Sequence, residues 1–418
     1  MARLSDDCFA SGGDLLPMAA ALELLAAKTA PVVEWESVPL AVARGRILAE
    51  PILAPHDVPP HDNAAVDGYA VFFDDLAPGA PTLLPVVGRV AAGHPLPAAA
   101  RRGAAVRIFT GAPIPEGLDT VLMQEDCSEA KGTVRIPPGV KRGANRRRAG
   151  EDIKSGTTVL GAGQRLRPQE IGLAASLGFA ALRVHRRLRV ALFSTGDELR
   201  DPGSALPPGA IYDANRYALL ALLEGLGAVV TDLGILPDER AGIHRAIAAA
   251  ADGHDLILTS GGMSTGEEDH VKAAVEAQGR LHFWRLAIKP GRPVALGQIG
   301  RVPFLGLPGN PAAMMVTFLL LARPLVLCLS GARHAAPRRF RVSAGFDYKK
   351  RSNRCDYLRA RLERGEAGGW VARKFPRDGA GILSPMVEAD GFAEIGEGIS
   401  RIEPGMSIDF IPFSEVLE

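Results

Sequence analysis

The fold is decided by the stretch LRVALFSTGDE at residues 188–198, in which an apolar run leads directly into a polar turn that contains glycine. The same pattern recurs up to about Ser330, so that predicted strands alternate with predicted helices. The strands are expected at residues 188–193, 228–233, 256–259, 281–288, 293–296 and 302–305, and the helices at 215–226, 239–251, 269–278 and 311–321. This alternation predicts a central doubly wound parallel α/β domain, with helices on both faces of its sheet.

Two further helices are predicted before this domain. The first has an apolar face that begins at Met18, with Pro17 suited to its first turn and Asp14 to its cap. The second is expected to open at Pro168 and to end at Gly178, because proline favours the first turn of a helix and glycine favours its end.

Two other segments have the pattern of β structure. Between residues 57 and 140 short apolar pieces alternate with turns rich in Pro and Gly, which predicts a small β-rich domain. From about Arg338 onward apolar and polar residues alternate, as at Phe340, Val342 and Ala344, and no helical stretch interrupts them. This period of two predicts a small C-terminal β-barrel or sandwich.

Composition limits the classes of function. The chain has 418 residues and 44.1 kDa, too long for one core, which predicts several domains. Lys and Arg number 48 against 47 Asp and Glu, and this balance gives no attraction to nucleic acid or to an anionic membrane. The four cysteines are widely spaced and include no CxxC, so neither a zinc site nor a disulfide framework is indicated.

The sequence also argues against a membrane protein. Asp6 and Asp7 stand where an export signal would need an apolar run. The apolar run at residues 312–329 is interrupted by Arg323-Pro324, so we expect a buried helix that ends there. A reducing cytoplasm is the expected location.

Three of the predicted strands run into glycine-rich turns: FSTGDE at residues 193–198, TSGGMSTG at 259–266 and LGLPGNP at 305–311. In a parallel sheet these turns lie at one edge, beyond the carboxyl ends of the strands, where ligands of open α/β folds bind. Glycine allows close approach of the backbone, and Ser, Thr and N–H groups can donate to an anion. One such turn alone is more often only a turn, but three together favour a phosphate-bearing ligand.

Charged residues accompany these turns. Glu198, Asp238 and Asp269 offer the oxygen ligands that magnesium prefers, although each acid alone is as well explained by a helix cap or a solvated loop. Lys289 and Arg292 lie three apart in a turn stiffened by Pro and Gly, a pair that suits a dianionic oxyanion. The alternative is a positively charged hairpin tip.

The β-rich region adds weaker motifs. Asp62 and Asp67 lie five apart ahead of a strand, and Thr110 follows another strand; each alone is typical of turn chemistry. Arg146 to Arg148, with Glu151 and Asp152, could form an ion-pair cluster or a solvated face. A P-loop GxxxxGK[ST], a GxSxG and an HExxH motif are all absent from the sequence.

Taken in order, these motifs resemble the molybdopterin molybdenumtransferase family, which includes the E domain of gephyrin. The matching pieces are residues 61–63 with 67–70, 110–113, 146–148 with 150–153, 194–198, 260–262 with Gly266 and Asp269, 289–291, and 307–311. Any one of these matches would be weak, whereas seven in the family's order are specific, and a weaker tail match extends them over nearly the whole chain.

The resemblance implies four domains. These are an elongated N-terminal and linker domain at residues 1–55 with 146–185, an inserted β-rich domain at 56–145, an α/β molybdopterin-binding domain at 186–331, and a C-terminal β-barrel at 332–418. It also implies a homodimer in which the active cleft is shared between subunits. The implied reaction inserts molybdate into adenylylated molybdopterin, with magnesium-dependent cleavage of the adenylate and release of AMP.

The resemblance further implies roles for single residues. The implied catalytic residues are Asp62, Thr110, Asp152, Asp238, Asp269 and Lys289, of which Asp62 and Thr110 reach the site from the partner subunit. Magnesium is implied to be bound or positioned by Glu198, Asp238 and Asp269. The implied substrate contacts are Ser194, Thr195, Gly196, Ser260, Gly261, Gly262, Ser264, Pro308, Gly309, Asn310, Lys289, Arg292, Arg359 and Ser384. Of these, Lys289, Arg292, Arg359 and Ser384 are implied to hold molybdate.

The sequence departs from the family in a few places. Arg285 and Arg292 stand where many relatives have Lys, Ala313 stands where Ser is common, and Ala149 is an extra residue after the arginine run. Two other functions stay open, a pterin-binding scaffold without turnover and a molybdopterin adenylyltransferase; that adenylyltransferase is also a candidate partner. The sequence does not distinguish molybdate from tungstate, nor does it identify the enzyme that receives the cofactor.

Overall fold

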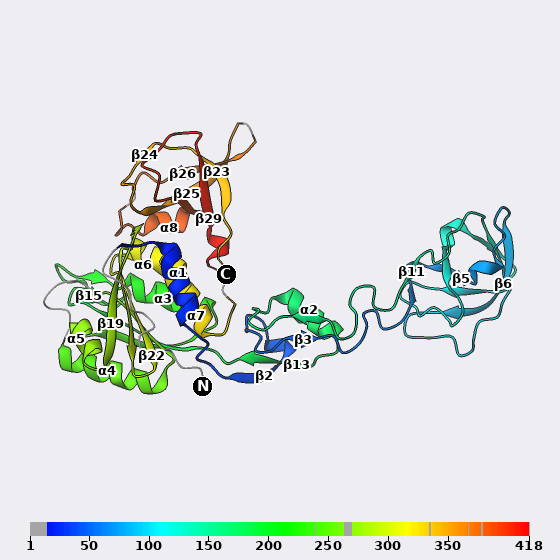
Figure 1. Ribbon diagram of the computed structural model, residues 1–418, viewed down its shortest axis with the longest axis horizontal. Helices are drawn as coiled ribbons and strands as arrows, with labels where there is room; N and C mark the ends of the chain where they lie inside the picture. The colour runs from blue at the N-terminus through cyan, green and yellow to red at the C-terminus, as the bar shows by residue number, and fades with distance from the viewer. Residues whose placement is uncertain are drawn as a thin grey trace. The chain divides into compact units, whose positions relative to one another are not determined.

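The computed structural model describes residues 15–237, 239–262, 270–333, 336–366, 368–377 and 379–417. The chain forms two compact units (Figure 1). The larger unit contains residues up to Glu50, Ala162–Arg167 and Ala181–Glu418, and the smaller unit contains Pro51–Gly161 and Pro168–Ala180. Each unit is described by itself.

The α/β domain of the larger unit is built on a seven-stranded sheet in the order β1-β19-β21-β22-β18-β14-β17. Its strands are β1 (Leu15–Leu16), β14 (Arg189–Thr195), β17 (Val229–Leu236), β18 (Leu256–Ser260), β19 (Gly279–Leu286), β21 (Pro293–Ile299) and β22 (Val302–Leu307). Its helices are α1 (Met18–Lys28), α3 (Ala214–Gly225), α4 (Arg240–Gly253), α5 (His270–Glu276), α6 (Pro311–Thr317) and α7 (Arg323–Leu329).

The sheet is parallel as predicted, apart from one strand. β14 pairs in parallel with β17 and β18, and β18 pairs in parallel with β22. β21 runs antiparallel to both of its neighbours, because short turns connect it to β19 and β22 and leave no room for a crossover helix. The carboxyl ends of β14, β18 and β22 therefore meet at one edge, as expected.

Helices cover both faces of this sheet. Successive residues of a strand point to opposite faces, and β14 shows the consequence. Val190 and Leu192 pack in a cluster with residues of α1, α3, α6 and α7, whereas Ala191 and Phe193 pack with residues of α4 and α5. α1 lies beside α7 (Figure 1). The doubly wound arrangement is confirmed.

The helix after β22 corrects one expectation. α6, a π-helical turn at Phe318–Ala322 and α7 follow without a break, so the helix does not end at Arg323-Pro324 as predicted. The π-helical turn, which ends two residues before Pro324, changes the local backbone hydrogen bonding, which lets a proline be accommodated inside a long helix. By length and composition Pro311–Leu329 could span a membrane, but buried core helices meet the same test, and 72% of its apolar window is buried.

The C-terminal region closes into a five-stranded barrel. The ring runs β25-β26-β23-β29-β27 and returns to β25. Its strands are β23 (Phe340–Ala344), β25 (Cys355–Arg364), β26 (Trp370–Lys374), β27 (Gly391–Ile395) and β29 (Ser407–Pro412), with β24 (Tyr348–Lys349) and β28 (Arg401–Ile402) as a separate pair. The expected absence of helix here is wrong in one place, because α8 (Ser384–Glu388) precedes β27 and packs Pro385 and Met386 inward.

Short strands complete the larger unit. β20 (Ile288–Lys289) leaves the α/β sheet and pairs in parallel with the first residues of β25. β2 (Trp35–Pro39) pairs with β13 (Ala181–His185), and β15 (Leu199–Arg200) pairs with β16 (Ile211–Tyr212). The pairing of β20 with β25 attaches the barrel directly to a loop of the α/β domain.

The smaller unit is β-rich, as the alternation of apolar pieces and turns predicts. Its six-stranded sheet has the order β8-β5-β7-β6-β10-β9. The strands are β5 (Gly68–Val71), β6 (Thr82–Val90), β7 (Ala105–Ile108), β8 (Thr120–Met123), β9 (Ser128–Ala130) and β10 (Thr133–Ile136). Two pairs lie outside this sheet, β3 (Ile52–Leu53) with β12 (Thr158–Leu160) and β4 (Asn63–Ala64) with β11 (Arg146–Arg147), and α2 spans Pro168–Ser176.

Candidate active site

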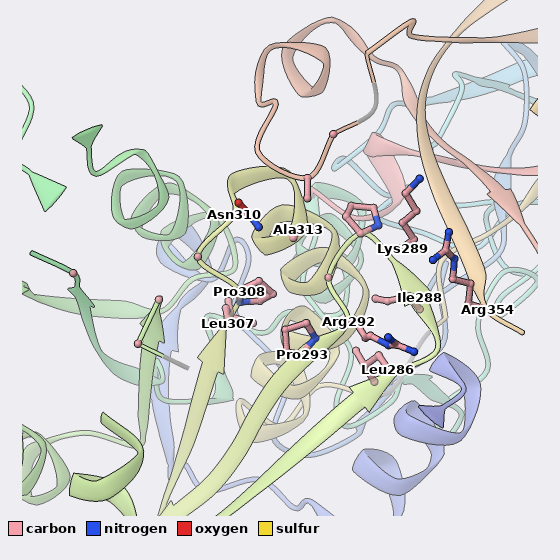
Figure 2. A pocket seen from close by; sticks show the side chains of 18 of the residues that line it. Leu286, Ile288, Lys289, Arg292, Pro293, Leu307, Pro308, Asn310, Ala313 and Arg354 are labelled. Atoms are coloured by element: carbon pink, nitrogen blue, oxygen red, sulfur yellow. The ribbon is translucent and has the colours of Figure 1, made fainter. Parts of the chain in front are cut away.

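A pocket of about 760 Å³ opens at the carboxyl edge of the α/β sheet. The turns after β14, β18 and β22 form one part of its wall, and residues 286–293 form another. The barrel completes it with Arg354, Gly379 and Ala380. Figure 2 shows Lys289, Arg292 and Arg354 on one side of the pocket, and Pro308 and Asn310 on the other. Segments far apart in the sequence thus meet at the predicted edge.

Glycine lets the turns after β14 and β18 pack against each other. Gly261 and Gly262 have φ values of +88° and +63°, a left-handed conformation that favours glycine. A Cβ on Gly262 would lie 2.4 Å from Thr195 Oγ1, and one on Gly261 would lie 3.0 Å from the Thr195 carbonyl oxygen. Both positions therefore require glycine, and backbone rather than side chain forms this part of the wall.

Asn215 of α3 connects the turns after β18 and β22. Its Nδ2 donates to Ser260 Oγ at 2.8 Å and to the Gly309 carbonyl oxygen at 2.7 Å. Ser260 Oγ lies 3.3 Å from the Pro308 carbonyl oxygen, to which it donates. Sequence reasoning missed Asn215, although an asparagine near the start of an otherwise apolar predicted helix is a signal that could have identified it.

The residues predicted to contact substrate in these turns fall into two groups. Thr195, Gly196, Gly261, Gly262, Pro308, Gly309 and Asn310 line the pocket. Ser194 and Ser260 do not: they are buried behind it, at 0% and 3% exposure. Asn310 is the N-cap residue of α6, but its side chain makes no capping hydrogen bond. Ser264 lies outside the described residues.

The predicted oxyanion pair, Lys289 and Arg292, lines the opposite part of the pocket. The turn between them packs tightly against α6. Gly291 has φ +99°, and a Cβ there would lie 2.2 Å from Thr317 Oγ1 and 3.0 Å from the Ala313 carbonyl oxygen. Thr317 Oγ1 also donates to the Gly291 carbonyl oxygen at 3.3 Å. The helix thereby fixes the loop that carries both cations.

The pocket has an excess of positive charge. Among its described lining residues Glu198 is the single carboxylate, against the cations Lys289, Arg292 and Arg354. Neither Lys289 nor Arg292 forms an ion pair with another described residue. An anion is therefore the ligand that this pocket favours.

The predicted magnesium ligands are described only in part. Glu198 lines the pocket, and Asp238 and Asp269 lie outside the described residues. Within the described ranges no group of three His, Cys, Asp or Glu side chains is arranged to hold a metal ion. The Glu198 carboxylate forms no ion pair with any described residue, so its oxygens are compatible with a hard cation such as magnesium.

The C-terminal candidates lie beside the pocket rather than in its lining. Arg359 is 2% exposed, and its Nη2 donates at 3.4 Å to the carbonyl oxygens of Arg377 and Gly379. It therefore supports, from behind, the segment that brings Gly379 and Ala380 to the pocket. Ser384 is the exposed first residue of α8 and is not part of the lining.

Three motifs predicted from the sequence lie close together in the smaller unit: the residues around Asp62, the arginine run at residues 146–148 and the segment that contains Asp152. β4 follows Asp62 and pairs with β11, the strand that contains Arg146, and Asp62 forms an ion pair with Arg146. Asp62 Oδ1 also accepts a hydrogen bond at 2.7 Å from the backbone N of Ala149, the extra residue of this sequence. Asp152 is exposed, and its backbone N donates to the Val58 carbonyl oxygen at 3.1 Å.

Thr110 belongs to the same cluster. It donates two hydrogen bonds to Asp67 Oδ1, from its backbone N at 2.8 Å and from its Oγ1 at 2.7 Å. These bonds, the backbone bond above all, lower the pKa of Asp67 below its ordinary value. Backbone pairing of residues 62–64 with residues 111–114 therefore holds Asp62, Asp67 and Thr110 in one place, although each of the three side chains already has a partner inside the unit.

Comparisons with known proteins agree with this architecture. The family model for the MoeA N-terminal region (domain I and II) matches residues 16–178, that for a probable molybdopterin-binding domain matches 191–327, and that for the MoeA C-terminal region (domain IV) matches 341–413. A molybdopterin molybdenumtransferase of Haemophilus influenzae is 40% identical over 386 residues, 92% of this chain and 95% of the relative. One from a Nostoc species is 38% identical over 305 residues, 71% of this chain and 70% of the relative.

Solved structures give the same result. A molybdopterin biosynthesis MoeA protein from Pyrococcus horikoshii has a TM-score of 0.82 at 28% identity and covers 96% of this chain and 100% of that one. A second structure, also titled as a MoeA protein from Pyrococcus, has a TM-score of 0.77 at 32% identity, covering 96% of this chain and 99% of that one. The fold and the pocket define a multidomain α/β protein with a pocket that favours an anionic ligand. More specifically, the chain belongs to the molybdopterin molybdenumtransferase family.

Proposed function

We propose that this chain inserts molybdate into adenylylated molybdopterin, with magnesium-dependent cleavage of the adenylate and release of AMP. Membership of the family makes it a molybdenum-transferring enzyme that acts on molybdopterin. The single observation that carries the finer reaction is the pocket itself, where glycine turns, one described carboxylate and three cations surround a space of about 760 Å³.

In this reaction the glycine turns bind the phosphate groups of the substrate. The backbone around Gly196, Gly262 and Gly309 approaches the ligand closely, since no side chain intervenes there. Lys289 and Arg292 hold the molybdate dianion; Arg292 can donate two parallel hydrogen bonds, and Lys289 acts as a point charge. Arg359 orients the barrel segment that borders the pocket.

Magnesium is part of the proposal. Glu198 would hold it, with Asp238 and Asp269 as the further predicted ligands. When bound, the cation neutralises charge that develops on the phosphoanhydride as it breaks. Glu198 lines the pocket from the turn after β14, and the cations Lys289 and Arg292 line it from the loop at residues 286–293.

The remaining parts of the proposal concern organisation. We infer a homodimer in which Asp62 and Thr110 of one copy reach the pocket of the other, with Asp152 supporting the cleft and Ser384 acting from the barrel. The four-domain division, a cytoplasmic location and an encounter with the molybdopterin adenylyltransferase belong to the same proposal. Support for the shared cleft comes from the clustering of Asp62, Thr110 and Arg146 in one compact unit.

The proposed function is tested with purified full-length protein, adenylylated molybdopterin, molybdate and magnesium. We expect release of AMP in proportion to cofactor formed, and loss of that release when magnesium is chelated. Substrate that binds without AMP release would favour a scaffold, and consumption of ATP with unmodified molybdopterin would favour an adenylyltransferase; either result contradicts the proposal. The Glu198→Gln variant should require a higher magnesium concentration, and replacement of molybdate by tungstate in the same assay measures the preference for the oxyanion.

A further inference from the structure

Arginine and aromatic side chains contact one another at one end of the sheet of the smaller unit. The guanidinium carbon of Arg107, on β7, lies 5.0 Å from the centroid of the Tyr69 ring and 4.8 Å from that of the Phe109 ring. The guanidinium carbon of Arg89, on β6, lies 4.7 Å from the same Phe109 centroid. Tyr69 is buried, Arg107 and Phe109 are half-buried, and Arg89 is exposed. The series therefore leads from the core of the unit to its surface, and we call Arg89, Arg107 and Phe109 the arginine–phenylalanine cluster.

A one-residue register shift between β6 and β7 brings the two arginines to the same face. The strands are parallel, and Val86 of β6 lies opposite Ala105 of β7. Three residues further along β6, Arg89 lies opposite Arg107, which is only two residues further along β7. Successive residues of a strand point to opposite faces, so the extra residue, as in a β-bulge, redirects a side chain. Without the shift Gly88 would lie opposite Arg107, and Arg89 would point to the other face.

The charge of these two arginines is not neutralised within the unit. Arg107 is held by neutral groups, since its Nη1 donates to the Gly68 carbonyl oxygen at 3.0 Å and its Nη2 donates to Gln124 Oε1. Neither Arg89 nor Arg107 forms an ion pair with a residue that the structure describes. Like charges directly opposite each other destabilise a sheet, and contact with the Phe109 ring offsets only part of that repulsion. An anion at this position would relieve the rest.

The arginine–phenylalanine cluster lies at the end of the sheet that carries Thr110. Thr110 follows Phe109 directly, and the Phe109 backbone N donates at 3.1 Å to the carbonyl oxygen of Val90, the last residue of β6. A Cβ on Gly111 would lie 3.9 Å from the Cβ of Ala92, so the turns that follow β6 and β7 are in contact. The cluster is therefore close to the hydroxyl that the proposed function assigns to the substrate cleft.

We propose that the arginine–phenylalanine cluster is a substrate-binding surface for a planar heterocycle that carries a phosphate. Flat rings stack on guanidinium planes and on aromatic side chains, and the same guanidinium groups donate to phosphate oxygens. The adenine and the pterin of adenylylated molybdopterin both have this chemistry. The inference deepens the proposed function, on which it rests for the identity of the ligand. The competing explanation is that the cluster only stabilises the end of the sheet.

The first experiment compares Arg89→Ala with Arg135→Ala in the full-length protein. Arg135 is an exposed arginine of β10 in the same sheet. It points to the other face, because its neighbour Val134 packs in the core cluster with Tyr69. It therefore controls for loss of an arginine from this sheet.

Calorimetric titration with AMP, and separately with molybdopterin, measures binding to each variant. We expect at least about fivefold weaker binding in Arg89→Ala than in Arg135→Ala for one of the two probes, and that probe identifies the ring that stacks. Arg135→Ala should resemble the unmodified protein. Equal binding of both probes to the two variants, or binding of neither probe to the unmodified protein, would overturn the proposal.

The second experiment separates ligand binding from folding. Arg89→Lys keeps the charge and removes the flat guanidinium, so it should recover only part of the affinity that Arg89→Ala loses. Phe109→Leu keeps an apolar side chain and removes the ring, and it should also weaken binding of the same probe. Arg89→Ala should leave the melting temperature nearly unchanged, because it removes a repulsion together with a ring contact. A lowered melting temperature with unchanged probe binding would show a purely structural cluster and would overturn the inference.

Probe binding needs no turnover, so this inference and the proposed reaction can fail separately. If the unmodified protein releases no AMP from adenylylated molybdopterin while Arg89→Ala still loses affinity for a probe, the reaction fails and the binding surface stands. If the protein turns over normally and Arg89→Ala matches Arg135→Ala in probe binding and in KM for adenylylated molybdopterin, only the inference about the arginine–phenylalanine cluster fails.

Discussion

The pocket of the larger unit and the motif cluster of the smaller unit use polar residues in opposite ways. In the pocket, backbone turns and cations dominate, and neither Lys289 nor Arg292 has a carboxylate partner among the described residues. In the cluster, Asp62 is paired with Arg146, and Asp67 accepts two hydrogen bonds from Thr110. An anion site is thus recognised by cations that have no carboxylate partner. Acids that already have a partner stabilise the unit in which they lie.

The largest effect is expected from a substitution in the pocket turn that lies between Lys289 and Arg292. Gly291→Ala should destabilise the larger unit by about 3 kcal/mol, because it combines strain at φ +99° with a clash against Thr317 and Ala313. Gly300→Ala is the matched control, since Gly300 has φ +57° and open space around it. Urea unfolding should give a loss about 2 kcal/mol smaller for the control. Similar losses in both variants would show that the turn does not pack as described.

The next effect concerns charge in the same turn. Lys289→Met keeps most of the length of the side chain and removes its charge, so KM for molybdate should rise roughly 100-fold with little change in unfolding free energy. Lys349→Met, an exposed lysine outside the pocket, is the control and should leave KM unchanged. Steady-state kinetics at varied molybdate measures both. An unchanged KM in Lys289→Met would contradict the assignment of the oxyanion site.

A smaller effect compares two buried asparagines, one in each unit. Asn215→Ala removes two hydrogen bonds of 2.8 and 2.7 Å and should cost about 2 kcal/mol, since the Gly309 carbonyl oxygen loses its donor. Asn63→Ala, at the motif cluster, removes one long bond of 3.5 Å to the His61 carbonyl oxygen and should cost less. Chemical denaturation of both variants gives the comparison. A larger loss in Asn63→Ala would reverse the ranking of the two regions.

The smallest effect tests the pairing within the cluster through pH. The hydrogen bonds from Thr110 lower the pKa of Asp67 below 3.8, so their contribution to stability is present above that pH and is lost as the pH falls through the lowered value. Thr110→Val removes the hydroxyl bond and keeps the backbone bond, which is the larger cause of the lowered pKa, so the pKa of Asp67 should rise only part of the way. NMR titration of the Asp67 carboxyl measures the change; a full return to the ordinary value would show that the hydroxyl alone was responsible.

The sequence by itself determined the local elements of this protein. The run at residues 188–198 became β14 and its turn, and Gly261 and Gly262 became the left-handed residues that the turn after β18 requires. Lys289 and Arg292 were identified from a turn whose proline and glycine hold them close together. Such features follow from periodicity and from backbone preferences, which depend on residues only a few positions apart.

Tertiary structure decided which residues that are far apart in the sequence come into contact. The antiparallel direction of β21, the continuation of the helix through Pro324 and the short helix α8 depend on packing and on connections that no local pattern contains. The burial of Asp356 behind the pocket follows from the pairing of β20 with β25, two strands separated by more than sixty residues of chain. The hydrogen-bonding capacity of a buried acid is met only by the partners that folding brings to it. Its surroundings could therefore not be predicted from the sequence alone.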